Sequence, residues 1–262
     1  MNKGIFSILP IEGVFVIVLL VTFSSVLAGF TLGRRFRDRK SDNDAPPIGS
    51  VIGALFALLA FMLALTFSSA SGRYDTRKQL LLDEVNAIGT AFLRTSFLEE
   101  EDKQQSQALI KRYVQIRVNA LNQKESLTKR ISDSESIQKE LWRIATNYPK
   151  GDVNGAITMS YASALNEVFD YHTSRIVVAV TYRVHSSIWG VLLTVSVLSM
   201  AALGFQFAYS GGRRVWLCLL LATTFSLVLL LIEDLDRPGQ GTIQVSQRPM
   251  FMLLESITEE SK

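Results

Sequence analysis

The sequence predicts an all-α membrane protein with four transmembrane helices and a helical bundle between the second and the third. Charged residues make up only 19% of the 262 residues, against about 25% in a typical soluble domain. The apolar residues gather in four long runs. Between the second and third runs they recur every three or four positions, which is the period of a helix rather than of a strand.

Four apolar runs are long enough for transmembrane helices, because a helix needs about 20 apolar residues to cross the hydrocarbon core. The first run has one charge, Glu12, near its start. Its basic residues follow rather than precede it, so we interpret it as an uncleaved span and not as a signal peptide. The second and third runs carry no charge. The four spans are residues 11–32, 48–70, 187–209 and 215–232.

Basic residues differ between the two sides of the membrane. Four spans put both termini and residues 71–186 on one side, and the short loops 33–47 and 210–214 on the other. Short cytoplasmic loops are rich in Lys and Arg, so we expect these loops to be cytoplasmic, in the cell inner (plasma) membrane. The residues that favour this orientation are Arg34, Arg35, Arg37, Arg39, Lys40, Arg213 and Arg214, and those that oppose it are Arg73, Arg77 and Lys78.

We expect residues 71–186 to form a helical bundle that is continuous with spans two and three. No proline interrupts residues 48–97, which predicts one helix roughly 75 Å long at 1.5 Å per residue. Two shorter helices follow, and the polar SDSES segment at 132–136 is expected to cap the second of them. A last helix is expected to continue into the third span, with or without a kink near His185. The apolar stripes of these three helices are Leu109, Tyr113, Ile116 and Ala120; Ile137, Leu141, Ile144 and Tyr148; and Ile157, Tyr161, Leu165, Val168, His172, Ile176 and Val180.

The chain thus divides into spans one and two with a basic connecting loop (1–70), the bundle (71–186), spans three and four (187–232), and an acidic juxtamembrane turn with a C-terminal tail (233–262).

No phosphate loop, nucleophile elbow or zinc signature is present in the sequence. The two histidines, His172 and His185, lack metal-ligand spacing, and His172 lies on a core stripe. Cys218 is the single cysteine, so no disulfide forms within the chain. We therefore expect no enzyme, no nucleic-acid partner and no resident cofactor, and we leave open whether the bundle is purely structural or senses a ligand.

One face of the second span has a graded composition, from apolar residues to hydroxyl groups to arginines. In an oligomer, such residues form a hydrophobic constriction above a polar vestibule whose basic residues, Arg73 and Arg77, attract anions. The same face also suits close helix packing. The two arginines also suit lipid headgroups or pairing with Asp75 and Asp83. The candidate pore-lining residues are Ala57, Phe61, Leu65, Ser68, Ser69 and Gly72.

Three carboxylates follow the fourth span: Glu233, Asp234 and Asp236. Carboxylate oxygens are the ligands that calcium prefers, so a calcium site is one interpretation. The other is ion pairing with arginines at the base of the second span. No twelve-residue calcium loop is present, which favours ion pairing.

Several segments resemble the bacterial bestrophin-like family of unknown function, and together they cover essentially the whole chain. They are LTFSSASGRYDTRKQLLLDEVNAIGTAFLR, ALNEVFDYHTSRI, the loop GGRR and the tail LDRPGQGTIQVSQRP. More distantly, the chain is similar to bestrophins, which are pentameric anion channels with a calcium clasp after the last span. Their pore is lined by the second span, with an apolar neck before the motif Arg-Trp-Trp-Glu-Ala-Arg. Here that motif corresponds to Arg73-Tyr74-Asp75-Thr76-Arg77, and the neck positions fall on Ala57, Phe61 and Leu65.

The resemblance implies a homo-oligomeric channel in the lipid bilayer, a pentamer by preference, that conducts an inorganic anion. Bestrophins keep their helical domain in the cytosol, whereas the loop arginines here predict the reverse orientation. The alternative function is a non-conducting membrane scaffold or sensor whose bundle binds a partner protein. An enzyme that acts on lipids is a third, weaker reading.

Overall fold

A computed structural model describes residues 9–37, 48–119, 126–147, 153–212, 215–238 and 241–260, and every regular element in these ranges is a helix. The chain divides into two compact units. Unit 1 comprises residues 1–74 and 180–244, and unit 2 comprises residues 75–179 and 245–262. Several residues of the predicted loops and stripes lie outside the described ranges, namely Arg39, Lys40, Ala120, Tyr148, Arg213 and Arg214.

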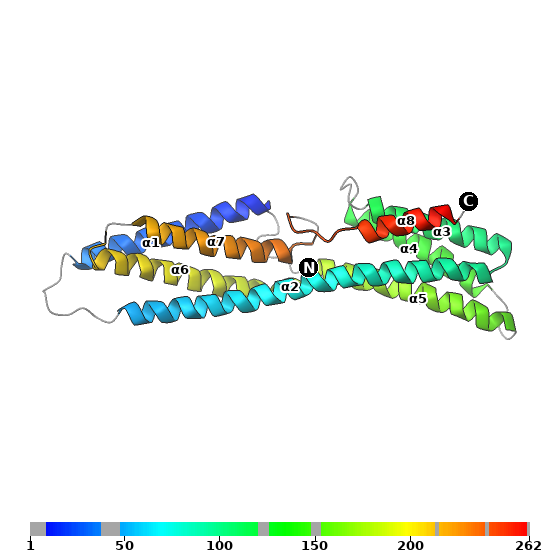
Figure 1. The fold of residues 1–262 in the computed structure, drawn as a ribbon, viewed down its shortest axis with the longest axis horizontal. Helices are drawn as coiled ribbons and strands as arrows, with labels where there is room; N and C mark the ends of the chain where they lie inside the picture. The colour runs from blue at the N-terminus through cyan, green and yellow to red at the C-terminus, as the bar shows by residue number, and fades with distance from the viewer. Residues whose placement is uncertain are drawn as a thin grey trace. The chain divides into compact units, whose positions relative to one another are not determined.

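Unit 1 is a bundle of long apolar helices (Figure 1). In the described part of the chain, four helices are long and apolar enough to cross a membrane, which confirms the predicted spans. Two of them extend beyond the predicted limits, α1 to Arg37 and α7 to Asp236. The helices of this unit are α1 (Ile11–Arg37), the first part of α2 (Ile48–Arg94), α6 (Ser186–Tyr209) and α7 (Val215–Asp236).

Helices α1 and α6 touch through their backbones at three glycines. A Cβ atom at Gly29 would stand 1.9 Å from the carbonyl oxygen of Ala201, and one at Gly204 would stand 2.2 Å from that of Val26. Gly33 is equally close to α6. Small residues allow membrane helices to approach in this way and gain van der Waals contact where no hydrophobic driving force acts between them. The contact fixes α1 against α6.

One side of α2 packs into the core of unit 1. Leu59 and Leu63 are buried there against apolar residues of the other three helices. Thr22 on α1 and Ser226 on α7 form a buried hydroxyl hydrogen bond of 3.1 Å, which adds a polar contact between two spans. The other members of this core are Val14, Val18, Ala70, Val184, Trp189, Leu192, Leu229, Ile232 and Leu235.

Unit 2 is a second helical bundle with its own apolar core (Figure 1). It contains the remainder of α2, the 3₁₀ turn η1 (Thr95–Phe97), α3 (Glu100–Asn119), α4 (Leu127–Thr146), α5 (Val153–Val180) and α8 (Arg248–Glu259). The predicted helix over residues 48–97 is confirmed as α2, and its end tightens into the 3₁₀ turn. The predicted stripes supply much of the core, including Leu109, Tyr113, Ile137, Leu141, Ile144, Tyr161, Leu165 and Val168.

The predicted cap of α4 is wrong. The helix begins at Leu127, and the side chain of Ser126 accepts a hydrogen bond from the backbone N–H of Lys129. The SDSES segment lies inside the helix, where the buried Ser134 hydroxyl donates to the carbonyl of Arg130 over 2.8 Å. A serine six residues before the SDSES segment therefore supplies the cap that SDSES was expected to supply.

The predicted continuity between the bundle and the third span is also wrong. Helix α5 ends at Val180, residues 181–185 are not helical, and α6 begins at Ser186. The imidazole of His185 accepts a hydrogen bond from the N–H of Ser187, so it caps the new helix. The cap fixes where α6 begins, and no proline or glycine in residues 181–185 marks the break.

The tail contains a helix that the sequence prediction lacks. Helix α8 starts just after Gln247, with a proline in its first turn. Its buried residues Met250 and Ile257 belong to the core of unit 2. The described residues 245–260 therefore belong to unit 2.

Candidate functional site

All six candidate pore-lining residues lie on the exposed face of α2. Phe61 is 61% exposed and Leu65 is 56% exposed, although both are large apolar side chains. Ala57, Ser68, Ser69 and Gly72 are exposed as well. The opposite side of the helix is buried at Leu59, Leu63, Thr66 and Ala70. Within unit 1 the other spans thus cover one side of α2 and leave the graded face open.

The polarity of this face changes along the helix. Phe61 and Leu65 are followed by the exposed hydroxyls of Ser68 and Ser69, and no heavy atom lies within 4 Å of a Cβ built at Gly72. A polar group of a membrane helix is favoured where it meets another protein chain or water rather than lipid tails. The serine part of the face is therefore better suited to a protein-lined or water-filled space than to the lipid.

Arg73, the residue that follows Gly72 at the end of this face, is held by two partners. Its Nε atom donates to Oδ1 of Asp236 over 2.9 Å, and its Nη1 atom donates to the Ser69 hydroxyl, also over 2.9 Å. Asp236 is 4% exposed and accepts a further bond of 3.0 Å from the backbone N–H of Val184. The arginine is thus ion-paired, and it orients one of the two exposed hydroxyls. Of the predicted partners, Asp83 accepts a hydrogen bond from Gln79 over 2.9 Å.

The three carboxylates after the fourth span have three different partners. Glu233 binds Arg237 at 2.8 Å, and that guanidinium also donates to the carbonyl of Leu9. Asp234 accepts from the backbone N–H and the hydroxyl of Thr242. Together with the Arg73 pair of Asp236, this arrangement favours ion pairing and turn formation. In the described residues no group of three or more His, Cys, Asp and Glu side chains is placed to hold a metal, and the calcium site stays a prediction.

The turn after α7 depends on Gly241. Its φ angle is +139°, a region that side chains disfavour, and a Cβ atom there would stand 1.9 Å from Oδ1 of Asp234. The carboxylate can therefore reach the following N–H groups only because this position has no side chain.

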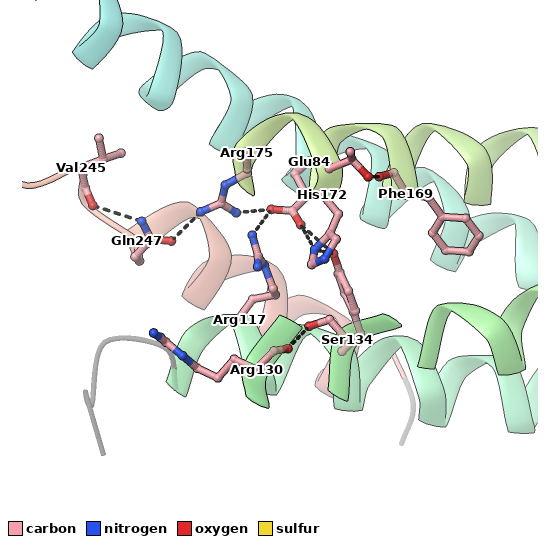
Figure 2. A network of polar contacts seen from close by, with 11 residues as sticks. Glu84, Arg117, Arg130, Ser134, Phe169, His172, Arg175, Val245 and Gln247 are labelled. Carbon is pink, nitrogen blue, oxygen red and sulfur yellow. Dashed lines mark hydrogen bonds and ion pairs between the residues drawn. The ribbon is translucent and has the colours of Figure 1, made fainter. Parts of the chain in front are cut away.

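A second network of polar groups lies inside unit 2, around Glu84 (Figure 2). Glu84 on α2 has no exposed surface. Its Oε2 atom accepts from Arg175 on α5 and, over 3.2 Å, from Arg117 on α3, while its Oε1 atom accepts from the Tyr113 hydroxyl over 2.7 Å. His172 on α5 completes the set, with Nδ1 at 3.0 Å from the Tyr113 oxygen. We call these five residues the Glu84 network.

Burial and charge act in opposite directions on the central carboxylate. Burial by itself raises the pKa of Glu84, but Arg117, Arg175 and the Tyr113 hydroxyl outweigh it and hold the pKa below its ordinary value. Burial lowers the pKa of His172 to about 4, and Arg117 acts in the same direction. Burial and the carboxylate raise the pKa of Tyr113. Near neutral pH the network therefore contains one anion, two cations and a neutral imidazole.

The network extends to the C-terminal segment. Nη2 of Arg175 donates to Oε1 of Gln247 over 3.3 Å, and the amide nitrogen of the same glutamine donates to the carbonyl of Val245. Gln247 is the residue just before α8. One guanidinium thus links the buried carboxylate of α2 to the start of the last helix (Figure 2).

Sequence reasoning placed Tyr113 and His172 on core stripes but missed Glu84, Arg117 and Arg175. A signal was present, since Glu84 falls on the apolar stripe between Leu81 and Ile88. A charge on a buried stripe needs a partner. The cavity beside this core has a volume of about 10 Å³, room for no more than one water molecule, so it does not accommodate a metabolite.

The architecture defines a four-span membrane protein with an extramembrane helical bundle. The family model of the Bestrophin-like domain matches residues 17–250, and the chain belongs to this family. No curated protein matches the sequence.

Crystal structures of a bacterial bestrophin homologue from Klebsiella pneumoniae share the fold. A structure phased on zinc has a TM-score of 0.66 at 11% identity, covering 96% of this chain and 98% of the other. The structure of a single-residue variant has a TM-score of 0.66 at 13% identity, with the same coverage of both chains. Another crystal structure, described only as that of a membrane protein, has a TM-score of 0.70 at 11% identity and covers 96% of this chain and 98% of the other. At these identities the likeness shows the fold alone.

Proposed function

We propose that this protein is a homo-oligomeric, anion-selective ion channel whose pore is lined by α2. The observation that carries the proposal is the open face of α2, on which all six candidate residues are exposed while the opposite side is packed. Membership of the bestrophin-like family supports it, because the characterised members of that family are anion channels.

In this proposal, Phe61 and Leu65 from several subunits form apolar rings that control the passage of water and ions. The hydroxyls of Ser68 and Ser69 then offer hydrogen-bond donors to an anion that has passed the rings. Arg73 contributes little net charge, because Asp236 neutralises it at 2.9 Å. Its role is to hold the Ser69 hydroxyl, and the attraction of anions falls to the hydroxyls of Ser68 and Ser69.

We further propose a pentamer in the bacterial inner membrane, with loops 33–47 and 210–214 in the cytoplasm. The pentamer is supported by the resemblance to bestrophins. The orientation is supported by Arg34, Arg35 and Arg37 at the end of α1. The channel as proposed needs no calcium, since Glu233, Asp234 and Asp236 are each engaged by groups of the chain itself.

The test is single-channel recording of the purified protein in planar bilayers under a chloride gradient. Phe61→Ala should raise the unitary current or the open time, because it widens the apolar ring. Phe67→Ala is the matched control: Phe67 is also exposed but lies about 120° around the helix from Phe61, at 100° per residue. Equal effects of the two variants would contradict the assignment of the pore face. A silent bilayer from intact oligomers would contradict the channel and favour the scaffold or sensor.

A further inference from the structure

The Glu84 network has more positive than negative charge before any histidine titrates. The charged and titratable groups that face His172 in the described part of the chain are Glu84 from α2, Tyr113 and Arg117 from α3, and Arg175 from α5 itself. Two guanidiniums thus stand against one carboxylate, and the imidazole is only 2% exposed. A further cation at this place would be poorly solvated and close to two like charges.

The hydrogen bonds determine which nitrogen of His172 carries the proton. An ionised carboxylate only accepts, so the single hydroxyl proton of Tyr113 is donated to Glu84. The hydroxyl oxygen must then accept from His172, which places the imidazole proton on Nδ1. The other nitrogen, Nε2, keeps a lone pair, is buried and has no hydrogen-bond partner among the described residues. It is a basic atom in the middle of the bundle to which no described group donates.

We propose that His172 is an acid-operated latch, in which uptake of a proton at Nε2 places a third cation against the single Glu84 carboxylate and loosens α5 from α2 and α3. The closed latch is the arrangement in Figure 2, with the imidazole neutral. The loosening extends to the C-terminal segment, because Arg175 on the same helix binds both Glu84 and Gln247.

The direction of the pH effect follows from the two states of His172. In the closed bundle its pKa is about 4, below the ordinary value of 6.5. In the loosened bundle the imidazole meets water and recovers its ordinary pKa. Between pH 6.5 and 4 the loosened state therefore binds one more proton, and each pH unit of acidification favours it about tenfold. Above pH 6.5 the latch is insensitive to pH.

The state of His172 can be read directly by nitrogen-15 NMR of the full chain in lipid bilayers, because the protein has only two histidines. His185→Asn removes the other signal and retains a capping side chain at the start of α6. We expect the Nδ1–H tautomer near neutral pH and protonation of Nε2 only near pH 4. An Nε2–H tautomer, or protonation of Nε2 near pH 6.5, would overturn the latch.

The loosening itself is measured by amide hydrogen exchange of α5, corrected for the intrinsic effect of pH. We expect protection around His172 to fall about 100-fold between pH 6.5 and 4.5 in the wild type. His172→Asn places an amide donor near the position of Nδ1 and cannot titrate, so it should lose this dependence. His172→Gln is the second variant if the asparagine leaves α5 unprotected at neutral pH. The same dependence in the wild type and in a protected variant would refute the proposal.

A last measurement separates the latch from the channel. The latch is a property of unit 2, and amide hydrogen exchange of α5 detects it whether or not the protein conducts ions. The idea that it controls conductance rests on the proposed function, because Glu84 lies on α2, the proposed pore helix. Acid loosening of α5 in a protein that carries no current would support the latch and contradict only the channel.

Discussion

Arg73 on α2 and Asp236 at the end of α7 form an ion pair of 2.9 Å inside unit 1. The carboxylate is 4% exposed and also accepts from the N–H of Val184, in the segment before α6. This single side chain therefore connects three parts of the membrane unit. It also gives Arg73 a structural partner at the position where a channel would otherwise present a free positive charge.

Asp236→Asn should destabilise the protein, since it leaves the Arg73 guanidinium without its anion and weakens the bond to Val184. Loss of one partner of a largely buried pair costs about 3–5 kcal/mol, less where the other partner reaches water. Arg73 is 21% exposed in its side chain, so we expect about 1–3 kcal/mol. The measurement is thermal unfolding in detergent. Asp75→Asn, at an exposed carboxylate of the same helix, should change the melting temperature little, and an equal fall in both variants would contradict the assignment.

Gly204→Ala should disrupt the contact between α1 and α6. The new methyl group would lie 2.2 Å from the carbonyl oxygen of Val26, so the two backbones must separate along the whole contact. We expect a loss of folded protein in size-exclusion chromatography. Gly190→Ala is the control on the same helix, because outside the neighbouring backbone of α6 no described atom lies within 4 Å of a Cβ there. Alanine is the better helix former by up to about 1 kcal/mol, so this control should be neutral or slightly stabilising.

Glu84→Gln should be among the most destabilising single changes in unit 2. It leaves the partly buried Arg117 and Arg175 without their common anion, at a cost of up to about 3–5 kcal/mol. Urea unfolding followed by circular dichroism measures this loss. Asp83→Asn, one residue earlier, removes a carboxylate whose hydrogen bond to Gln79 is exposed, and it should cost well under 1 kcal/mol. A tolerant Glu84→Gln variant would mean that the network does not hold the bundle together.

The stability of unit 2 should fall on acidification in two stages. His172 has a pKa of about 4 in the folded state against an ordinary 6.5, so the unfolded chain binds the extra proton and stability falls from about pH 6.5 downward. The slope for one proton is about 1.4 kcal/mol per pH unit. The pKa of Glu84 is lowered, so its contribution is present above its ordinary pKa and is lost as pH falls through the folded value. Urea titrations at several pH values should show the first stage in the wild type and not in His172→Asn.

The four spans and the long second helix could be predicted because each depends on residues close together in the sequence. An apolar run without charges defines a span by itself, and the absence of proline between Ile48 and Arg94 is enough to keep α2 continuous. The break between α5 and α6 was missed for the same reason. His185 begins α6 by capping it with its side chain, and histidine is not a residue from which a cap is ordinarily predicted.

The Glu84 network could not be predicted from local pattern, because its partners lie far away along the chain. Arg117 is 33 residues from Glu84, and Arg175 is 91 residues from it. Only the packing of α2, α3 and α5 brings the three charges together. Conversely, the six candidate positions on α2 could be grouped from the sequence, since positions on one helix face need no knowledge of any other element; they are exposed in the structure, and their role in lining a pore stays a prediction.

The glycine contact between α1 and α6 limits how the membrane unit can change shape. With backbone against backbone at Gly29, Gly33 and Gly204, there is no layer of side chains that can change rotamer and let one helix slide past the other. The two helices must move as a single rigid body, and α7 is tied to them through Ser226. Within one chain, a rearrangement of unit 1 would therefore be expected to displace α2 relative to this body rather than to separate α1 from α6.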